Sequence, residues 1–333
     1  MQAGKVDDEI MEEGEATLML LKQRFEKNKQ FPAMGNSISK IMRVSNDVGG
    51  NRKLADIILQ DQFLTGKILS IVNSSMYNQF GGEIKTISRA VVILGVDQIQ
   101  SIAISIMVFE KMNKGAMAKL LKSYACQSFL SAYFAKKLVE NIKSIDFEEA
   151  FLVSMFHNLG KQVVLYFIPE KYNAISNLVT EKKHDEEKAC IEMLGVNYTE
   201  IGQFIALQLQ LPKNIILGIQ AKPKVIKERP TKTSDYLGQL ASLTNEILES
   251  AACGDNELAE QNLKSIIERY KASFILDYGK TLKMLEALSH TLLSYSSMLD
   301  INPDENVFCK NFIGFINSQT ELDEQQEAKA EAE

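Results

Sequence analysis

The chain has 333 residues and a formal net charge of −6. With 45% hydrophobic and 24% charged residues, it can form a buried apolar core under a solvated surface. It lacks a dense stripe of Lys and Arg interleaved with aromatic residues, so the sequence predicts no nucleic-acid partner. No apolar run reaches the ~18–20 residues of a membrane span, and the N-terminus has no signal-peptide pattern. We therefore expect a cytoplasmic protein with no membrane partner.

Both ends of the chain are acidic. Residues 1–15 and 319–333 each contain six acids and one lysine. Acidic ends without apolar anchors are usually solvated, so the sequence predicts a disordered tail over 319–333. The four cysteines, Cys126, Cys190, Cys253 and Cys309, form no CxxC pair. We expect four reduced thiols rather than a disulfide framework or a zinc ribbon.

The pattern along the chain predicts a mostly helical protein. Only six prolines occur, and Leu, Ile, Met, Ala and Lys dominate the long interval between Pro32 and Pro169. Asp146 is predicted to cap a helix, because Glu148 and Glu149 follow where the helix dipole favours negative charge. Asn78 with Gly81 and Gly82 indicates a turn. Helical spacing of apolar residues predicts helices within 8–27, 37–44, 54–72, 87–94, 99–109, 117–141, 147–168, 191–195, 200–211, 212–220 and 234–315.

The most informative feature is the dipeptide His157-Asn158 in the run Phe156-His157-Asn158-Leu159-Gly160-Lys161. It looks like a metal-binding His-Asp pair in which the aspartate has become an amide. A carboxylate can bridge two hard cations, whereas an amide keeps the shape and loses the charge. The dipeptide therefore suggests a hydrolase site that no longer holds a metal.

Several short motifs follow one another over about 200 residues. They are Phe31-Pro32, the run from Ile57 to Leu64, Asn73-Ser74-Ser75-Met76-Tyr77, the run from Ile87 to Gly95, and the run from His157 to Lys161. Their order and spacing resemble those of an HDOD domain protein, a branch of the HD phosphohydrolase superfamily found in bacterial signalling. Gln62 departs from the family pattern, which usually has Pro after the Asp.

The resemblance implies where metal ligands would lie in an active relative. Such enzymes use an upstream His, the His-Asp pair and a downstream Asp, but this chain has only three histidines, and none precedes His157. Ser123 or Tyr124 falls near the place of the upstream His, and Asn245 falls at the position of the last aspartate. The additional histidines of related cyclic-dinucleotide phosphodiesterases would fall near Tyr198 and Ala221-Lys222.

These residues allow a structural interpretation and a functional one. His157 follows an apolar segment, so it is most simply a core histidine hydrogen-bonded to a neighbour. The alternative is a remnant pocket formed by His157, Lys161, Tyr198 and Lys222 that still binds a nucleotide or another anion. A basic cluster lies further along the chain and consists of Lys222, Lys224, Lys227, Arg229 and Lys232. It is most simply a solvated linker, although it could dock an acidic partner or an anionic signal.

The sequence thus predicts an all-α fold in three parts. Residues 8–225 are expected to form the HDOD domain, with an N-terminal helical bundle over 8–115 and a degenerate HD-like helical core over 116–225. Residues 230–318 are expected to form a helical extension that packs on this core or links it to partners.

The expected function is non-enzymatic. One imidazole and two amides (His157, Asn158 and Asn245) cannot hold a hydrolytic metal tightly, so we expect neither a catalytic residue nor a cofactor. The prediction is a bacterial signal-transduction or regulatory module that binds protein partners in a signalling pathway. Two alternatives stay open. One is a metal-dependent phosphohydrolase acting on a nucleotide or cyclic dinucleotide with an unorthodox site, and the other is a sensor that binds such a ligand without cleaving it.

Overall fold

The structure is a computed structural model that describes residues 2–27, 30–45, 49–73, 84–112, 117–140, 142–298 and 301–332. Every regular element within these ranges is a helix, and no strand occurs among them, as the sequence predicts. The predicted turn at Asn78, Gly81 and Gly82 lies outside the described residues, as do Ser74 to Tyr77. No single described helix is long and apolar enough to cross a membrane, although Phe147–Phe167 and Pro169–Lys182, bent by 117°, together meet that test.

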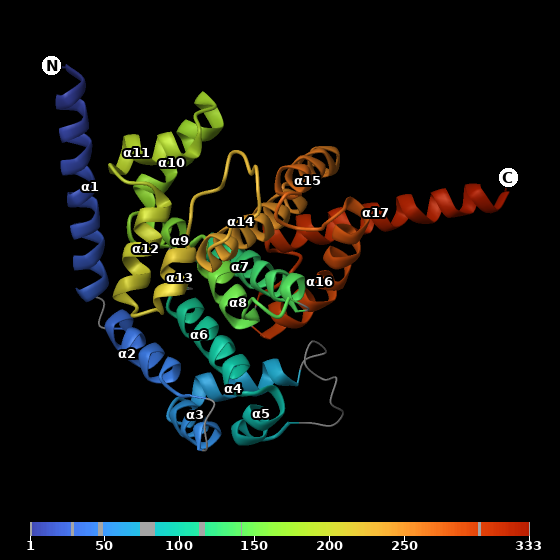
Figure 1. The fold of residues 1–333 in the computed structure, drawn as a ribbon, viewed down its shortest axis with the longest axis horizontal. Coiled ribbons are helices and arrows are strands. Elements are labelled where there is room, and N and C mark those ends of the chain that lie inside the picture. The colour runs from blue at the N-terminus through green and yellow to red at the C-terminus, as the bar shows by residue number, and fades with distance from the viewer. Residues whose placement is uncertain are drawn as a thin grey trace.

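The N-terminal part consists of one long helix and a bundle (Figure 1). Asn73 closes α4, because its Nδ2 donates to Leu69 O and to Ile84 O, both at 2.8 Å, while its Oδ1 accepts from Ile84 N at 2.7 Å. Pro32 lies in the first turn of α2, where its missing N–H costs nothing. The helices are α1 (Gln2–Lys27), α2 (Gln30–Met42), α3 (Gly50–Leu59), α4 (Gln62–Val72), α5 (Ile87–Leu94) and α6 (Val96–Met112).

The central part carries the His157-Asn158 dipeptide between two short helices. Asp146 caps the first of them as predicted, accepting hydrogen bonds from Glu148 N at 2.7 Å and Glu149 N at 3.3 Å. In the bundle α6 packs against α7 and α8 of this part. The helices are α7 (Ala118–Val139), α8 (Phe147–Phe156), α9 (Leu159–Phe167), α10 (Pro169–Lys182), α11 (Glu186–Leu194), α12 (Tyr198–Gln208) and α13 (Lys213–Gly218).

One predicted helix, 147–168, is interrupted in the structure. α8 ends at Phe156, residues 157 and 158 form a turn, and α9 begins at Leu159. The turn lets α9 lie against α12 at a very short separation, because Gly160 has no Cβ where the backbone of Tyr198 and Gly202 approaches it. The apolar spacing continues on both sides of the break, so the periodicity could not reveal it.

The C-terminal part packs on the central part. α14 contacts α7, α8 and α13, and most of its residues from Tyr236 to Ala251 are buried. The helices are α14 (Thr233–Ala251), α15 (Asn256–Tyr270), α16 (Tyr278–Met298) and α17 (Val307–Ala332). α17 continues through residues 319–332, where the sequence predicts a disordered tail, because this stretch is rich in the strong helix formers Glu, Gln and Ala. The end of α17 projects from the body (Figure 1).

The long helix α1 lies along α11 and α12 through a contact between two glycines (Figure 1). Gly195 ends α11 with a φ of +69°, and a Cβ on it would overlap Gly14 N. A Cβ on Gly14 would lie 2.8 Å from Gly195 O. The side chain of Glu13 adds an ion pair of 3.1 Å to Lys171, whose Nζ also donates to Met193 O at 2.7 Å. α1 therefore supports the segment that leads into α12.

Candidate functional site

The turn between α8 and α9 brings Asn158 against α14. Asn158 Nδ2 donates a hydrogen bond of 3.0 Å to Asn245 Oδ1. Asn245 is 1% exposed, and its Nδ2 donates at 2.9 Å to Ser154 O and at 2.9 Å to Ala241 O. Ser154 belongs to the last turn of α8, whose carbonyls have no partner within the helix. The two amides thus join α8, the turn and α14.

The structure brings together all four residues of the predicted pocket. His157, Lys161, Tyr198 and Lys222 line one cavity of about 320 Å³. Asn158, the next residue in the chain, also lines it. Whether the cavity binds a ligand stays a prediction.

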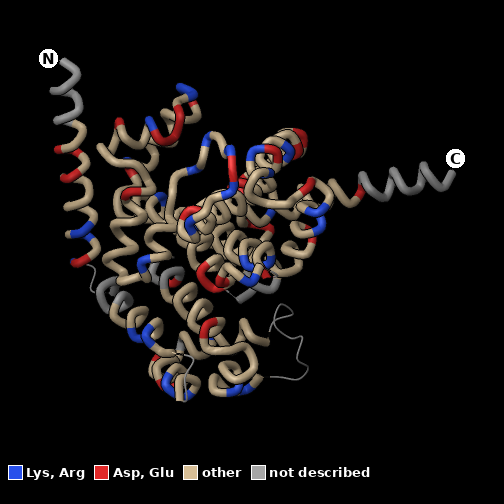
Figure 2. Tube along the Cα trace, viewed as in Figure 1, with Lys and Arg blue, Asp and Glu red and all other residues tan. Residues whose placement is uncertain are grey.

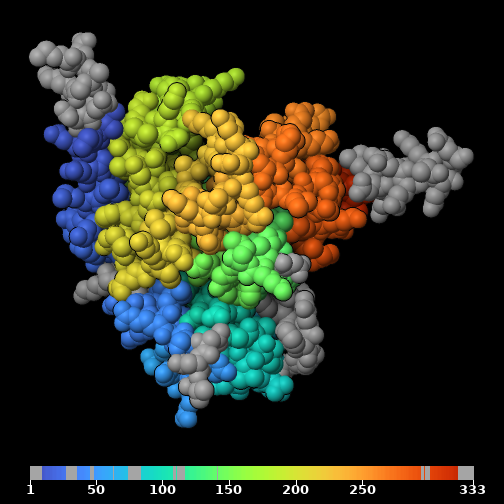
Figure 3. Space-filling model, viewed as in Figure 1, coloured from blue at the N-terminus to red at the C-terminus, as the bar shows by residue number. Residues whose placement is uncertain are grey.

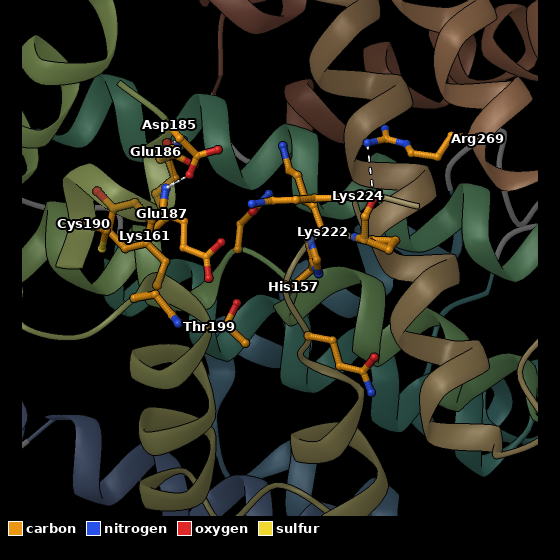
Figure 4. A pocket seen from close by; sticks show the side chains of 16 residues that line it. His157, Lys161, Asp185, Glu186, Glu187, Cys190, Thr199, Lys222, Lys224 and Arg269 are labelled. Atoms are coloured by element: carbon orange, nitrogen blue, oxygen red, sulfur yellow. Dashed lines mark hydrogen bonds and ion pairs between the residues drawn. The ribbon is translucent and has the colours of Figure 1, made fainter. Parts of the chain in front are cut away.

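His157 lies at the floor of this cavity (Figure 4). Its Nδ1 atom is fully buried and has no hydrogen-bond partner among the residues that the structure describes. Burial disfavours the charged imidazolium and the nearby Lys222 ammonium adds repulsion, so the pKa of His157 falls to about 3. The ring is therefore neutral near neutral pH, and the predicted hydrogen bond to a neighbouring group is not present at Nδ1.

Lys161 lines the cavity from α9, beside the start of α11. Its Nζ lies 2.6 Å from Glu186 Oε1, and its side chain is 15% exposed. The ammonium also lies over the rings of Tyr124 at 5.6 Å and Tyr198 at 6.0 Å. Burial opposes the charge on Lys161, but Tyr124 and Glu186 outweigh it and hold the Lys161 pKa above its ordinary value.

Lys222 comes from the irregular segment 219–232, which joins α13 to α14. Figure 3 shows this segment, in gold, between the green α10–α11 region and the orange α15 region. Lys222 Nζ lies 2.7 Å from Glu249 Oε2, with the two side chains 42% and 51% exposed. Figure 2 shows residues of both charge signs along the segment and beside it. Lys222 therefore lines the cavity and at the same time forms an exposed ion pair with Glu249.

The positions predicted for the upstream histidine hold no equivalent ligand. Ser123 Oγ donates to Asn306 Oδ1 at 3.2 Å, so it turns toward the loop before α17. The hydroxyl of Tyr124 is hydrogen-bonded to that of Tyr172 at 2.8 Å. Burial raises the pKa of Tyr124, and the hydroxyl stays protonated. Tyr124 contributes its ring to the surroundings of Lys161 rather than a metal ligand.

The sequence did not identify the acidic wall of the cavity or the contribution of α15. Asp185, Glu186 and Glu187 line the cavity from the start of α11, and Arg269 lines it from α15. Asp185 caps α11 by accepting from Glu187 N at 3.1 Å and Lys188 N at 3.3 Å. A charge run at a helix start looks like a solvated surface, so only the tertiary contact places these side chains at a cavity.

The side chains at the predicted metal position do not fit a hydrolytic cation. The amide nitrogen of Asn158 points a proton at the only oxygen that Asn245 could offer to a metal. The Nζ of Lys222 adds a positive charge close to His157. Among the residues that the structure describes, no group of three or more His, Cys, Asp and Glu side chains has a metal-binding arrangement.

Comparisons with known proteins agree on the fold. Residues 31–225 match the family model of the HDOD domain. A protein from Shewanella amazonensis SB2B, named as a candidate phosphohydrolase, has a similar structure, with a TM-score of 0.64 and 20% identity, covering 84% of this chain and 98% of that chain. An HDOD domain protein of unknown function from Geobacter sulfurreducens gives a TM-score of 0.60 and 18% identity, with 85% and 97% covered.

A third similar structure carries a signalling description. It is a candidate signal transduction protein from Marinobacter aquaeolei VT8, with a TM-score of 0.57 and 18% identity, covering 82% of this chain and 58% of that chain. No curated protein matches the chain. Identities near 20% establish a shared fold and leave the function to be argued from the site.

Proposed function

The chain belongs to the HDOD family, and we propose that it is a non-catalytic regulatory protein of a bacterial signalling pathway. In this proposal it works in the cytoplasm by binding other proteins, and its HD-type site has become a structural link. The observation that supports this most directly is the hydrogen bond between Asn158 and Asn245.

The chemistry of the two amides supports the loss of the metal. Two carboxylates at this separation would repel each other unless a cation or proton lay between them. Two amides attract each other directly, since one donates where the other accepts. The Asn245 side chain also donates to Ser154 O and Ala241 O, so its amide orientation is fixed by three hydrogen bonds. In a metal site, a cation links the side chains that bind it. Here the hydrogen bond between the two amides forms that link.

Hydrolysis would also need a nucleophile near neutral pH. A metal-bound water loses its proton near pH 7 because the cation stabilises the hydroxide. The neutral His157 ring could accept a proton from water, but its low pKa of about 3 makes it a weak base. This supports a binding role over a catalytic one.

The test is the metal content of the untagged protein, measured by elemental mass spectrometry, together with hydrolysis of bis(p-nitrophenyl) phosphate with added Mn²⁺. We expect metal far below one equivalent per chain and no hydrolysis above that of buffer. One or two equivalents of iron, manganese or zinc, with hydrolysis that a chelator abolishes, would establish the alternative of a metal-dependent phosphohydrolase.

A further inference from the structure

The walls of the cavity beside His157 carry opposite charges. Asp185, Glu186 and Glu187 lie on one side together with the single cation Lys161, and Lys222, Lys224 and Arg269 lie on the other (Figure 4). The acids come from one helix start, whereas the three cations opposite come from the segment 219–232 and from α15. The cavity is therefore electrically polarised from one wall to the other.

Most of these charges already have partners. Glu186 pairs with Lys161 at 2.6 Å, Lys222 pairs with Glu249 at 2.7 Å, and Arg269 pairs with Glu246. Asp185 accepts the backbone N–H groups that begin α11. Glu187 and Lys224 are the two whose side chains have neither an ion pair nor a hydrogen bond within the described part of the chain. One unpaired carboxylate and one unpaired ammonium thus lie on opposite walls of one cavity.

His157 also lines the cavity, between the two walls. Its Nδ1 has no accessible surface and no hydrogen-bond partner in the described structure, so a ligand in the cavity does not reach that atom. The ring is neutral, so His157 adds no charge to either wall.

We propose that this cavity binds a small zwitterion, with its anionic group at Lys224 and its ammonium or guanidinium group at Glu187. A volume of about 320 Å³ is at the lower end of ligand pockets, about 300–1,000 Å³, and suits a molecule of amino-acid size. A basic amino acid such as arginine has the required carboxylate and distant cation. The proposal supplies an input signal to the regulatory role and does not depend on the loss of catalysis.

The same polarity selects against other ligand classes. A molecule with several phosphates would place negative charge against the acidic wall, and a simple polyamine would place positive charge against the basic wall. A zwitterion alone satisfies both walls at once. The prediction therefore separates this cavity from a pocket for a cyclic dinucleotide.

The experiment is isothermal titration of the full chain with L-arginine in buffer containing EDTA, so that metal binding plays no part. Agmatine, which lacks the carboxylate, and orthophosphate, which lacks the cation, serve as half-ligands. The variants are Glu187→Gln and Lys224→Gln, since neither breaks an ion pair. Glu181→Gln and Lys227→Gln remove exposed charges away from the cavity lining and serve as matched controls.

We expect arginine to bind more tightly than either half-ligand. Each cavity variant should weaken arginine binding about two- to fivefold, as for an exposed ion pair of up to about 1 kcal/mol. Agmatine binding should weaken in Glu187→Gln and stay unchanged in Lys224→Gln, with the reverse for orthophosphate. The control variants should bind arginine as the parent does.

Three results would overturn the proposal. They are no arginine binding at millimolar concentration, binding that neither cavity variant changes, and tighter binding of a cyclic dinucleotide than of arginine. None of these results bears on the metal content, so the proposed regulatory function stands or fails separately.

Discussion

Asn158 Nδ2 and Asn245 Oδ1 are joined by a hydrogen bond of 3.0 Å across 87 residues of sequence. The bond connects a turn at the cavity to a helix that is almost wholly buried. It also fixes which end of each amide faces the other, since the Asn245 Nδ2 atom is already committed to Ser154 O and Ala241 O.

The substitution Asn245→Asp should destabilise the protein by about 2–5 kcal/mol at pH 7. It removes two donated hydrogen bonds and places a charge at a position that is 1% exposed. The penalty should shrink at pH 5, because a buried carboxyl can be protonated there. Urea unfolding at both pH values measures this, with the exposed Asn256→Asp as the control. Equal stability of the parent and Asn245→Asp would contradict the proposed structural link.

Gly160→Ala should destabilise the protein by about 2–4 kcal/mol. The new Cβ would overlap the carbonyl of Tyr198 and lie 2.7 Å from Gly202 N, so α9 and α12 would have to separate. Gly66→Ala is the matched control in α4, where nothing lies within 4 Å of an added Cβ. That variant should be neutral or more stable by up to about 1 kcal/mol. Thermal unfolding of the two variants side by side checks the difference.

The stability of the parent protein should fall faster in mild acid than that of His157→Gln. The folded pKa of His157, about 3, is below the ordinary value of 6.5, so the unfolded chain binds a proton that the folded chain does not. The contribution of this pKa difference to the free energy of unfolding is fully present above pH 6.5. It is lost as the pH falls towards 3, by up to about 1.4 kcal/mol per pH unit.

Urea unfolding between pH 7.5 and pH 5 measures this slope, and His290→Gln, at an exposed position in α16, controls for the loss of a histidine. Parallel profiles for the parent and His157→Gln would show that the ring is solvated.

In cells, a folded His157→Gln should keep most of the regulatory phenotype if the residue is structural. Complete loss with unchanged folding would instead assign His157 a direct role in signalling.

A chain that ends at Val225, the predicted end of the HDOD domain, should not be stable alone. It would lack α14, whose Leu237, Leu240 and Leu243 are each 0% exposed in the full chain. The faces of α7 and α8 that α14 covers would be exposed to water. We expect aggregation or strong binding of a hydrophobic dye, compared with the full chain. A soluble, cooperatively folding fragment would show instead that 8–225 is an independent unit.

The sequence predicted the helical class and the cap at Asp146, because helical spacing and capping residues are local signals. The four residues that meet at the cavity were expected together only from what the family resemblance implies. The sequence did not predict the break at His157-Asn158, since the stabilising contacts come from Asn245 and from Gly202 in other helices. It also gave no reason to place Glu187 opposite Lys224. Their relation depends on how α11 and the segment 219–232 pack, which no local pattern encodes.

The burial of α14 has a consequence for the order of events during synthesis. The ribosome completes α8 and the following turn long before it reaches residue 245. At about 5–20 residues per second, a gap of 87 residues corresponds to roughly 4–17 seconds. Throughout that interval the nascent chain holds an uncovered apolar surface and an unmatched amide. Because of this delay, the nascent chain avoids misfolding only when its last third has been made and has packed on the earlier helices.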